Sequence, residues 1–276
     1  MAMDPIVKLK RLFGRTPRVG VSLAGGGAKG VAYIPFLRAL EELEVDIAAI
    51  SGSSIGAAIG GLYAAGLGPA ELAGVLDSFR PGHLHEVFRI NWHGHGLISG
   101  KSVRKFLETT LPVERFDQTR IPLKVVATDY WRREQVVFDS GSLVDAIQAS
   151  TAVPAVFEPV VLDGRVLVDG SIKNTLPYEL LRDECDFLIG LDVSNRAKDP
   201  DRTDLPRTLV MVLNTFRILT DSNTEYKLRY DPVDLYFRLE LPNVEMLDFY
   251  KYREIFDTVG PEVERFTREL SKKLGL

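Results

Sequence analysis

The pentapeptide GSSIG at residues 52–56 constrains the fold of this chain more than any other stretch. It follows an apolar run at residues 45–50 that has the length of a buried strand, and it opens an Ala-rich run with helical spacing. A strand that turns at once into a helix strains its turn residue, and Gly52 and Gly56 remove the side chains that would clash there. The pattern predicts that Ser54 projects from the turn as a nucleophile, at the positive end of the helix. A turn of small residues before a close-packed helix is the simpler alternative.

Short apolar runs alternate with segments of helical spacing along the rest of the chain. Strands are predicted at residues 18–24, 45–50, 124–128, 135–138, 165–168, 187–193 and 233–239, and helices at residues 31–44, 55–63, 69–79, 102–111, 143–150, 178–183, 208–228 and 249–274, with a candidate break at 260–261. This alternation predicts an α/β protein with a mostly parallel sheet covered on both faces. We expect one domain over residues 18–276, with the irregular stretch 80–97 as a mobile cap.

The composition excludes several classes of protein. A net charge of −4 over 276 residues gives no reason to expect a nucleic-acid partner. The single cysteine, Cys185, excludes an internal disulfide framework and is expected to be a buried structural thiol. No apolar stretch approaches the roughly 20 residues that span a bilayer, and the N-terminus lacks the apolar core of a signal peptide. We therefore expect a cytoplasmic protein.

A basic extension at residues 1–17 precedes the first predicted strand. The basic residues in this extension or directly after it are Lys8, Lys10, Arg11, Arg15 and Arg18. A segment of this kind is either a solvated tail or a point of peripheral contact with an anionic membrane surface, and both interpretations stay open.

A second glycine-rich motif follows the first predicted strand. Its members are Gly25, Gly26, Gly27, Ala28, Lys29 and Gly30. The spacing satisfies the dinucleotide-binding fingerprint, but that fingerprint needs an acidic residue at the end of the second strand, and the only acid there, Asp46, lies at its beginning. Because adjacent parallel strands end at the same edge of a sheet, the glycine N–H groups are expected to face Ser54 as an oxyanion hole. Lys29 either adds to the electrostatic field there or pairs at the surface.

A serine nucleophile requires a general base, and the sequence offers carboxylates as well as histidines. The histidines are His83, His85, His93 and His95. All lie in the irregular stretch, far from the C-terminal position of the histidine in α/β-hydrolases, and few carboxylates accompany them, so no metal site is expected. Asp169 follows a predicted strand and precedes Gly170, which makes it a candidate base at the edge of the sheet. Asp129 and Asp192 also follow buried strands, so position alone does not select among the three.

Four segments, GGGAKG, GSSIG, ASTAVPAVFEPV and VDGSIKNTLP, resemble those of the patatin-like phospholipase family in type, order and spacing. The similarity extends from about residue 18 to the C-terminus. The resemblance implies a three-layer α/β/α fold and a dyad without histidine, in which Ser54 is the nucleophile and Asp169 is the general base. The implied oxyanion hole consists of Gly25, Gly26 and Gly27. Ser171 stands where the family usually has glycine or alanine, and its hydroxyl is expected to change the hydrogen bonding of the base.

The same resemblance implies hydrolysis of a lipid acyl ester, such as a phospholipid or lysophospholipid, through an acyl-enzyme and without a metal or cofactor. Two alternatives stay open at this point. One is a transacylase that uses the same dyad. The other is a weakly active lipid-binding or regulatory protein, which Ser171 and the basic N-terminal segment would suit.

Overall fold

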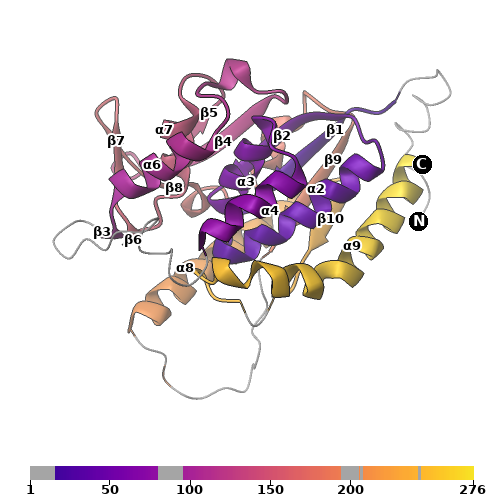
Figure 1. The fold of residues 1–276 in the computed structure, drawn as a ribbon. Helices are drawn as coiled ribbons and strands as arrows, with labels where there is room; N and C mark the ends of the chain where they lie inside the picture. The colour runs from indigo at the N-terminus through magenta and orange to yellow at the C-terminus, as the bar shows by residue number, and fades with distance from the viewer. Residues whose placement is uncertain (1–15, 80–95, 194–204, 206–207, 242–243) are drawn as a thin grey trace.

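The structure is a computed structural model that describes residues 16–79, 96–193, 205, 208–241 and 244–276 (Figure 1). Its main sheet has the strand order β10-β9-β1-β2-β4-β8-β7, and β5 also pairs with β4. The strands are β1 (Val19–Leu23), β2 (Ile47–Ser53), β4 (Leu123–Asp129), β5 (Glu134–Phe138), β7 (Val160–Leu162), β8 (Arg165–Asp169), β9 (Phe187–Asp192) and β10 (Leu235–Arg238). The strands from β10 to β4 are parallel, whereas β5 and β8 run antiparallel to β4. The mostly parallel sheet predicted from the sequence is confirmed.

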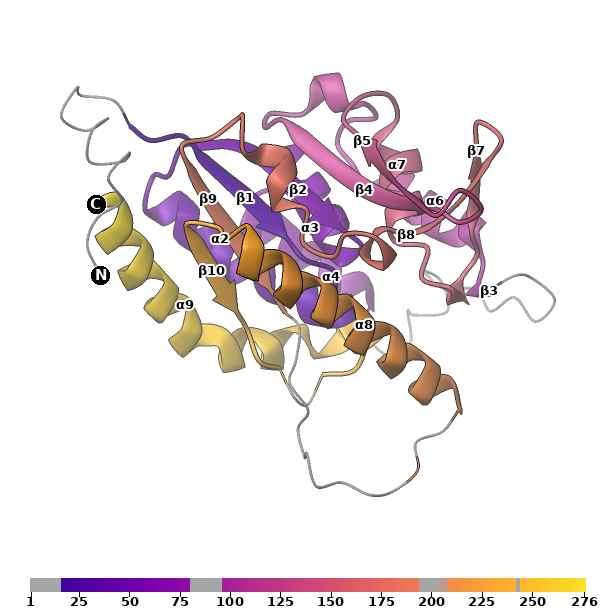
Figure 2. The same ribbon diagram turned by 180° about the vertical axis from the view of Figure 1, so that it is seen from behind.

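Helices cover both faces of this sheet. They are α2 (Tyr33–Glu42), α3 (Ile55–Ala64), α4 (Pro69–Leu76), α6 (Gly100–Thr110), α7 (Leu143–Ser150), α8 (Thr208–Tyr230) and α9 (Tyr252–Leu274). Figure 1 shows α2, α4 and α9 on one face, and Figure 2 shows α8 lying across the other. The arrangement is the expected three-layer α/β/α fold. Among the described residues, no helix combines the length and the apolarity needed to cross a bilayer.

The core forms where apolar helix faces meet the fully buried central strands. Every residue of β1 and β9 is buried, as expected of parallel strands that are covered on both sides. Phe36 on α2 packs against Phe237 on β10 and Phe266 on α9, with ring centroids 5.5 and 5.1 Å apart. α9 continues through Pro261, where the sequence offered a candidate break, and it bends along its length (Figure 1). A proline removes one helical hydrogen bond and bends a helix without necessarily ending it.

Several features differ from the sequence-based expectations. Residues 96–98 and 155–157 form two short parallel strands, β3 (Gly96–Ile98) and β6 (Ala155–Phe157), which make a small separate sheet. Strands of three residues are too short to show a period of two. Cys185 is only partly buried, and its Sγ lies 3.2 Å from the Leu181 carbonyl oxygen. Most of the proposed cap (residues 80–95) and most of the basic extension (residues 1–15) lie outside the described residues.

Candidate active site

β2 leads directly into α3, and Ser54 occupies the turn between them. Its φ of 53° and ψ of −126° form a conformation that residues with a side chain rarely adopt, at a cost of about 1–3 kcal/mol. The flanking glycines make the turn possible. A Cβ at Gly56 would lie 2.1 Å from the carbonyl oxygen of Leu23. The strained turn predicted from the pentapeptide is therefore present, with Ser54 at the N-terminus of α3.

Ser150, at the end of α7, ties this turn to the sheet. Its hydroxyl accepts the Ser54 N–H at 2.9 Å and donates to the carbonyl oxygen of Val126 at 2.6 Å. All three groups are buried, so Ser150 satisfies two backbone groups that would otherwise be costly to leave unpaired. This role of Ser150 was not predicted from the sequence. Its only signal was its place in the ASTAVP segment that carries the family resemblance.

Asp169 reaches Ser54 through the register of β4. Val126 of β4 pairs with Ser53, the last residue of β2, and the next residue, Ala127, pairs with Asp169, the last residue of β8. Because β2 is parallel and β8 antiparallel to β4, the C-terminal ends of β2 and β8 meet at neighbouring positions of β4. From the sequence, Asp169 was expected at the sheet edge because it follows a predicted strand. The antiparallel direction of β8 is the actual cause of its position.

The two side chains form a direct hydrogen bond. Ser54 Oγ donates to Asp169 Oδ2 at 2.6 Å, and Asp169 Oδ1 accepts the Ser171 N–H at 2.8 Å. Burial raises the pKa of Asp169 to about 6, and hydrogen bonds from Ser54 and Ser171 oppose this rise. A carboxyl group with this pKa is mostly ionised at neutral pH and is still a better proton acceptor than an exposed aspartate.

The other two candidate bases face different partners. Asp129 accepts the backbone N–H of Arg132 at 3.0 Å, and the guanidinium of the same residue lies 3.8 Å away. Asp192 accepts the hydroxyl of Tyr236 at 2.7 Å. The hydrogen bond to Ser54 is made by Asp169, so the geometry selects this aspartate where its position in the sequence did not.

The glycine motif lies beside the serine, but its amides are not equivalent. The Gly25 N–H donates to the carbonyl oxygen of Thr175 at 3.1 Å, so this amide is occupied. Within the described part of the chain, no protein partner is found for the N–H groups of Gly26 and Gly27, and both glycines line a pocket together with Ser54. Of the three amides expected to form an oxyanion hole, that of Gly25 already has a partner in the protein.

The remaining motif residues pack around the dyad. Gly30 abuts Ile55 of α3, and a Cβ at Gly170 would lie 2.0 Å from the carbonyl oxygen of Val126. The Ser171 hydroxyl lies 3.4 Å from Ser53 Oγ and directly against Gly25. The motif positions thus form one closely packed unit.

Lys29 is buried and does not pair at the surface, which removes one of its two sequence-based interpretations. Burial lowers its pKa to about 7, and the nearby Arg217 guanidinium lowers it further, whereas Glu245 and Asp221 act in the opposite direction. The ammonium group therefore contributes to the electrostatic field near the glycine motif in a pH-dependent way.

Among the described residues, two pockets open at Ser54. The first is almost wholly apolar and has a volume of about 110 Å³. Its lining comes mainly from α3, α4, α6 and α7 and includes Ala58, Ile59, Leu62, Phe79, Phe106 and Ile147. A cavity of this kind suits a hydrocarbon chain.

The second pocket is smaller, about 40 Å³, and more polar than the first, and it is called the polar pocket below. It lies between the glycine motif, Asp169 and the inner side of α8, which contributes Arg217, Thr220 and Asp221. Burial raises the pKa of Asp221 to about 6, and the neighbouring carboxylate of Asp192 adds to the rise. The two pockets therefore give Ser54 one apolar and one polar side.

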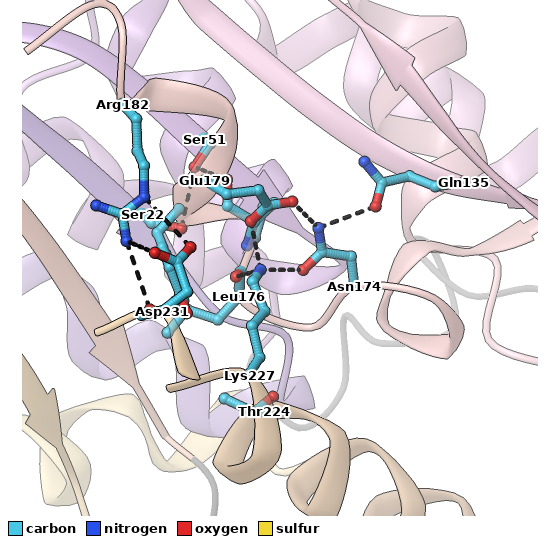
Figure 3. Close-up of polar contacts among 12 residues, drawn as sticks. Ser22, Ser51, Gln135, Asn174, Leu176, Glu179, Arg182, Thr224, Lys227 and Asp231 are labelled. Carbon is cyan, nitrogen blue, oxygen red and sulfur yellow. Dashed lines mark hydrogen bonds and ion pairs between the residues drawn. The ribbon is translucent and has the colours of Figure 1, made fainter. Parts of the chain in front are cut away.

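A polar network behind this pocket attaches α8 to the segment that follows Asp169 (Figure 3). Lys227 Nζ donates to Asn174 Oδ1 at 2.9 Å and to the Leu176 carbonyl at 2.8 Å, and it also pairs with Glu179. Asn174 Nδ2 donates in turn to Gln135 at 2.9 Å. The network braces the segment whose Thr175 carbonyl holds the Gly25 amide.

The four histidines fall within residues 80–95, outside the described residues. In the part of the chain that is described, no three His, Cys, Asp or Glu side chains are grouped as metal ligands would be.

Comparison with known proteins agrees with this geometry. The sequence profile of the patatin-like phospholipase family matches residues 21–182. An NTE family protein of Mycobacterium tuberculosis is 32% identical over 200 residues, which cover 72% of this chain and 55% of the relative. The lysophospholipase NTE1 of Kluyveromyces lactis is 26% identical over 285 residues, covering 92% of this chain and 19% of that protein. The chain thus spans about half the length of the first relative and a fifth of the second. Among solved structures, VipD from Legionella pneumophila superposes with a TM-score of 0.52 at 15% identity, covering 88% of this chain and 67% of VipD.

Proposed function

The chain belongs to the patatin-like phospholipase family, and from this membership and the geometry around Ser54 we propose that it hydrolyses acyl esters of lipids, such as phospholipids or lysophospholipids. The observation that carries the proposal is the 2.6 Å hydrogen bond from Ser54 Oγ to Asp169 Oδ2. The naming of the Kluyveromyces relative as a lysophospholipase supports the choice of substrate class.

In the first half of the reaction, Ser54 Oγ attacks the carbonyl carbon of the ester while Asp169 Oδ2 accepts the hydroxyl proton. The negative charge that develops on the carbonyl oxygen is met by the N–H groups of Gly26 and Gly27. Each donor of this kind is worth about 2.7–4 kcal/mol in the transition state. The tetrahedral intermediate then expels the alcohol, which takes the proton from Asp169, and the acyl group remains on Ser54.

In the second half, water attacks the acyl-enzyme and Asp169 accepts a proton from it. The fatty acid leaves as the proton returns to Ser54 Oγ. In this sequence one carboxyl group takes up and releases a proton twice, and a pKa of about 6 suits both directions of transfer. No histidine takes part in the proposed scheme.

The two pockets suggest how the ester binds. The apolar pocket accommodates the acyl chain, and the polar pocket accommodates the alcohol part with its head group. The scissile bond then lies at the boundary between them, where Ser54 is located.

Labelling with a fluorophosphonate tests the proposal directly. We expect one adduct, on the tryptic peptide that contains Ser54, no adduct in Ser54→Ala, and release of fatty acid from a lysophospholipid by the unmodified enzyme. An adduct at another serine would contradict the assignment of the nucleophile. Adding an alcohol acceptor separates the reaction types, because a transacylase would form a new ester at the expense of the free fatty acid.

A further inference from the structure

α8 has its charged and apolar faces reversed relative to an ordinary surface helix. Helices that cover a sheet place apolar side chains inward and charged ones toward water. On α8 the side chains of Val212, Ile218 and Leu219 are 53%, 65% and 61% exposed, and Val210 and Met211 are exposed as well. Large apolar side chains therefore cluster on the outer face of this helix.

The charged residues of the same stretch point inward. Residues 208–223 contain only two charged side chains, Arg217 and Asp221, and both line the polar pocket beside Ser54. The exposed polar residues between them and the helix start, such as Asn214 and Thr215, carry no charge. We define the outer face of α8 by Val210, Met211, Val212, Ile218 and Leu219.

Polarity also changes along the helix axis. Beyond residue 223 the exposed side chains become Glu225, Tyr226, Arg229 and Tyr230, and the rings of the two tyrosines pack together with centroids 4.6 Å apart. Tyrosines concentrate at the level where an apolar phase meets water, because the ring is apolar and the hydroxyl is polar. The outer side of α8 is thus uncharged over its N-terminal half, and tyrosines interleaved with charged side chains occupy its C-terminal part.

The position of the helix matches this gradient. Figure 2 shows the N-terminal half of α8 extending past the edge of the sheet, and Figure 3 shows its C-terminal end held by Lys227. Leu213 on the inner side packs against the same buried cluster as Met246, a residue that lines both pockets. Leu247, the next residue, is exposed and lines the apolar pocket. Apolar contacts therefore connect the inner side of α8 with the lining of the pockets.

We propose that the outer face of α8 is a lipid-contacting surface that seats the enzyme on a bilayer or micelle beside the entrance of its two pockets. The choice of a lipid surface over a protein partner rests on the proposed function, since a lipid substrate must leave an aggregate at this rim to reach Ser54. It also rests on the uncharged outer face and on the tyrosine boundary, which fit an apolar phase. The contact is separate from the basic N-terminal segment considered from the sequence.

Binding to vesicles tests this surface without catalysis. The full chain carrying Ser54→Ala is sedimented with vesicles of phosphatidylcholine, which have no net charge, before and after the pair Ile218→Gln and Leu219→Gln is added. We expect the pair to lower the partition coefficient about tenfold or more, with little dependence on salt, because apolar rather than ionic contacts are lost. The matched control is the pair Trp131→Gln and Val161→Gln, which removes side chains that are 75% and 72% exposed. Val161 lies on β7, away from α8 (Figure 2), and the control should bind within twofold of its parent.

The same pair in the enzyme with Ser54 intact gives a second measurement. Hydrolysis of a lysophospholipid held in vesicles should fall about tenfold, and hydrolysis of soluble p-nitrophenyl butyrate should stay within twofold. Unchanged vesicle binding by the folded Ile218→Gln and Leu219→Gln protein overturns the proposal. A second combined result also overturns the proposal: the parent sediments as a dimer, the variant sediments as a monomer, and neither binds vesicles. The outer face of α8 would then bind a second copy of the chain. Vesicle binding through α8 by an enzyme that hydrolyses no ester would keep the surface and remove the proposed function.

Discussion

The two pockets at Ser54 differ in what builds them. The apolar pocket is walled mainly by helices whose spacing of apolar residues is visible in the sequence, and its volume of about 110 Å³ is more than twice that of its neighbour. The polar pocket is assembled from the glycine motif, the end of β8 and the inner face of α8, which are far apart in the chain. The apolar pocket can therefore be derived from local periodicity in the sequence, whereas the polar pocket depends on the topology of the fold. If the proposed function is correct, the same division separates acyl-chain selection from head-group selection.

The largest effect should come from removing the carboxylate that bonds to Ser54, the serine that lines both pockets. Asp169→Asn is nearly isosteric but cannot accept a proton, so kcat/KM should fall by about 10⁴-fold with every substrate, whichever pocket it occupies. The matched comparison is an enzyme in which His83, His85, His93 and His95 are replaced by Gln or Asn, which should lose less than about tenfold. Circular dichroism and thermal melting must show that both variants are folded. A dead histidine-free enzyme beside an active Asp169→Asn enzyme would refute the dyad.

Filling the apolar pocket should affect only the selection of the acyl chain. Ala58 lines this pocket from α3, and Ala58→Phe would occupy space that a long acyl chain needs. We expect the ratio of kcat/KM for a long-chain to a butyryl ester to fall roughly 100-fold. Ala70→Phe, on the exposed side of α4, is the control and should leave the ratio unchanged. An equal loss for both chain lengths would place the acyl chain elsewhere.

Changing the polar pocket should affect the selection of the head group, and the effect should be smaller. Arg217→Gln removes a guanidinium that lines this pocket, and a phosphate-bearing head group would lose a charged donor. We expect kcat/KM to fall about tenfold for a lysophospholipid and less than twofold for a monoacylglycerol. Arg229→Gln, on the same helix but exposed to solvent, supplies the control. If the two substrates respond alike, Arg217 has no part in head-group recognition.

The smallest effect concerns Ser171, which lines the polar pocket beside Asp169. The base acts in its ionised form, so the rate should rise with pH through the Asp169 pKa of about 6. The Ser171 hydroxyl helps to hold that pKa down, and Ser171→Ala should therefore move the acid limb of kcat/KM to higher pH by about 0.3–0.5 unit. Ser53→Ala removes the neighbouring hydroxyl and should leave the limb in place. A shift to lower pH would mean that Ser171 disfavours the ionised form.

Much of the fold was predictable because parallel strands and the helices that cover them leave strong periodic signals. The strand–turn–helix at Ser54 follows from five residues, since only glycine permits the backbone contact at Gly56. Asp169 could be named only through the family resemblance, because the antiparallel pairing of β8 with β4 has no local signal. The role of Ser150 was missed for the same reason, since its partners, Ser54 and Val126, are set by tertiary packing.

The glycine motif shows the limit of reading a loop from its composition. Three consecutive glycines suggested three free amides, yet the Gly25 amide belongs to Thr175. That contact depends on a segment about 150 residues further along the chain, and no spacing rule connects the two. The short strands β3 and β6 were missed because each contributes only three residues to its pairing.

The end-to-end meeting of β2 and β8 along β4 also has a consequence for how the enzyme folds. The hydrogen bond between Ser54 and Asp169 spans 115 positions of the chain, and contacts of such separation form slowly because a large loop must first be closed. Helices such as α3 need only local contacts. During refolding we therefore expect helical circular dichroism to return before the serine becomes reactive toward a fluorophosphonate. A nascent chain would accordingly lack the proposed esterase activity until β8 has emerged and paired with β4.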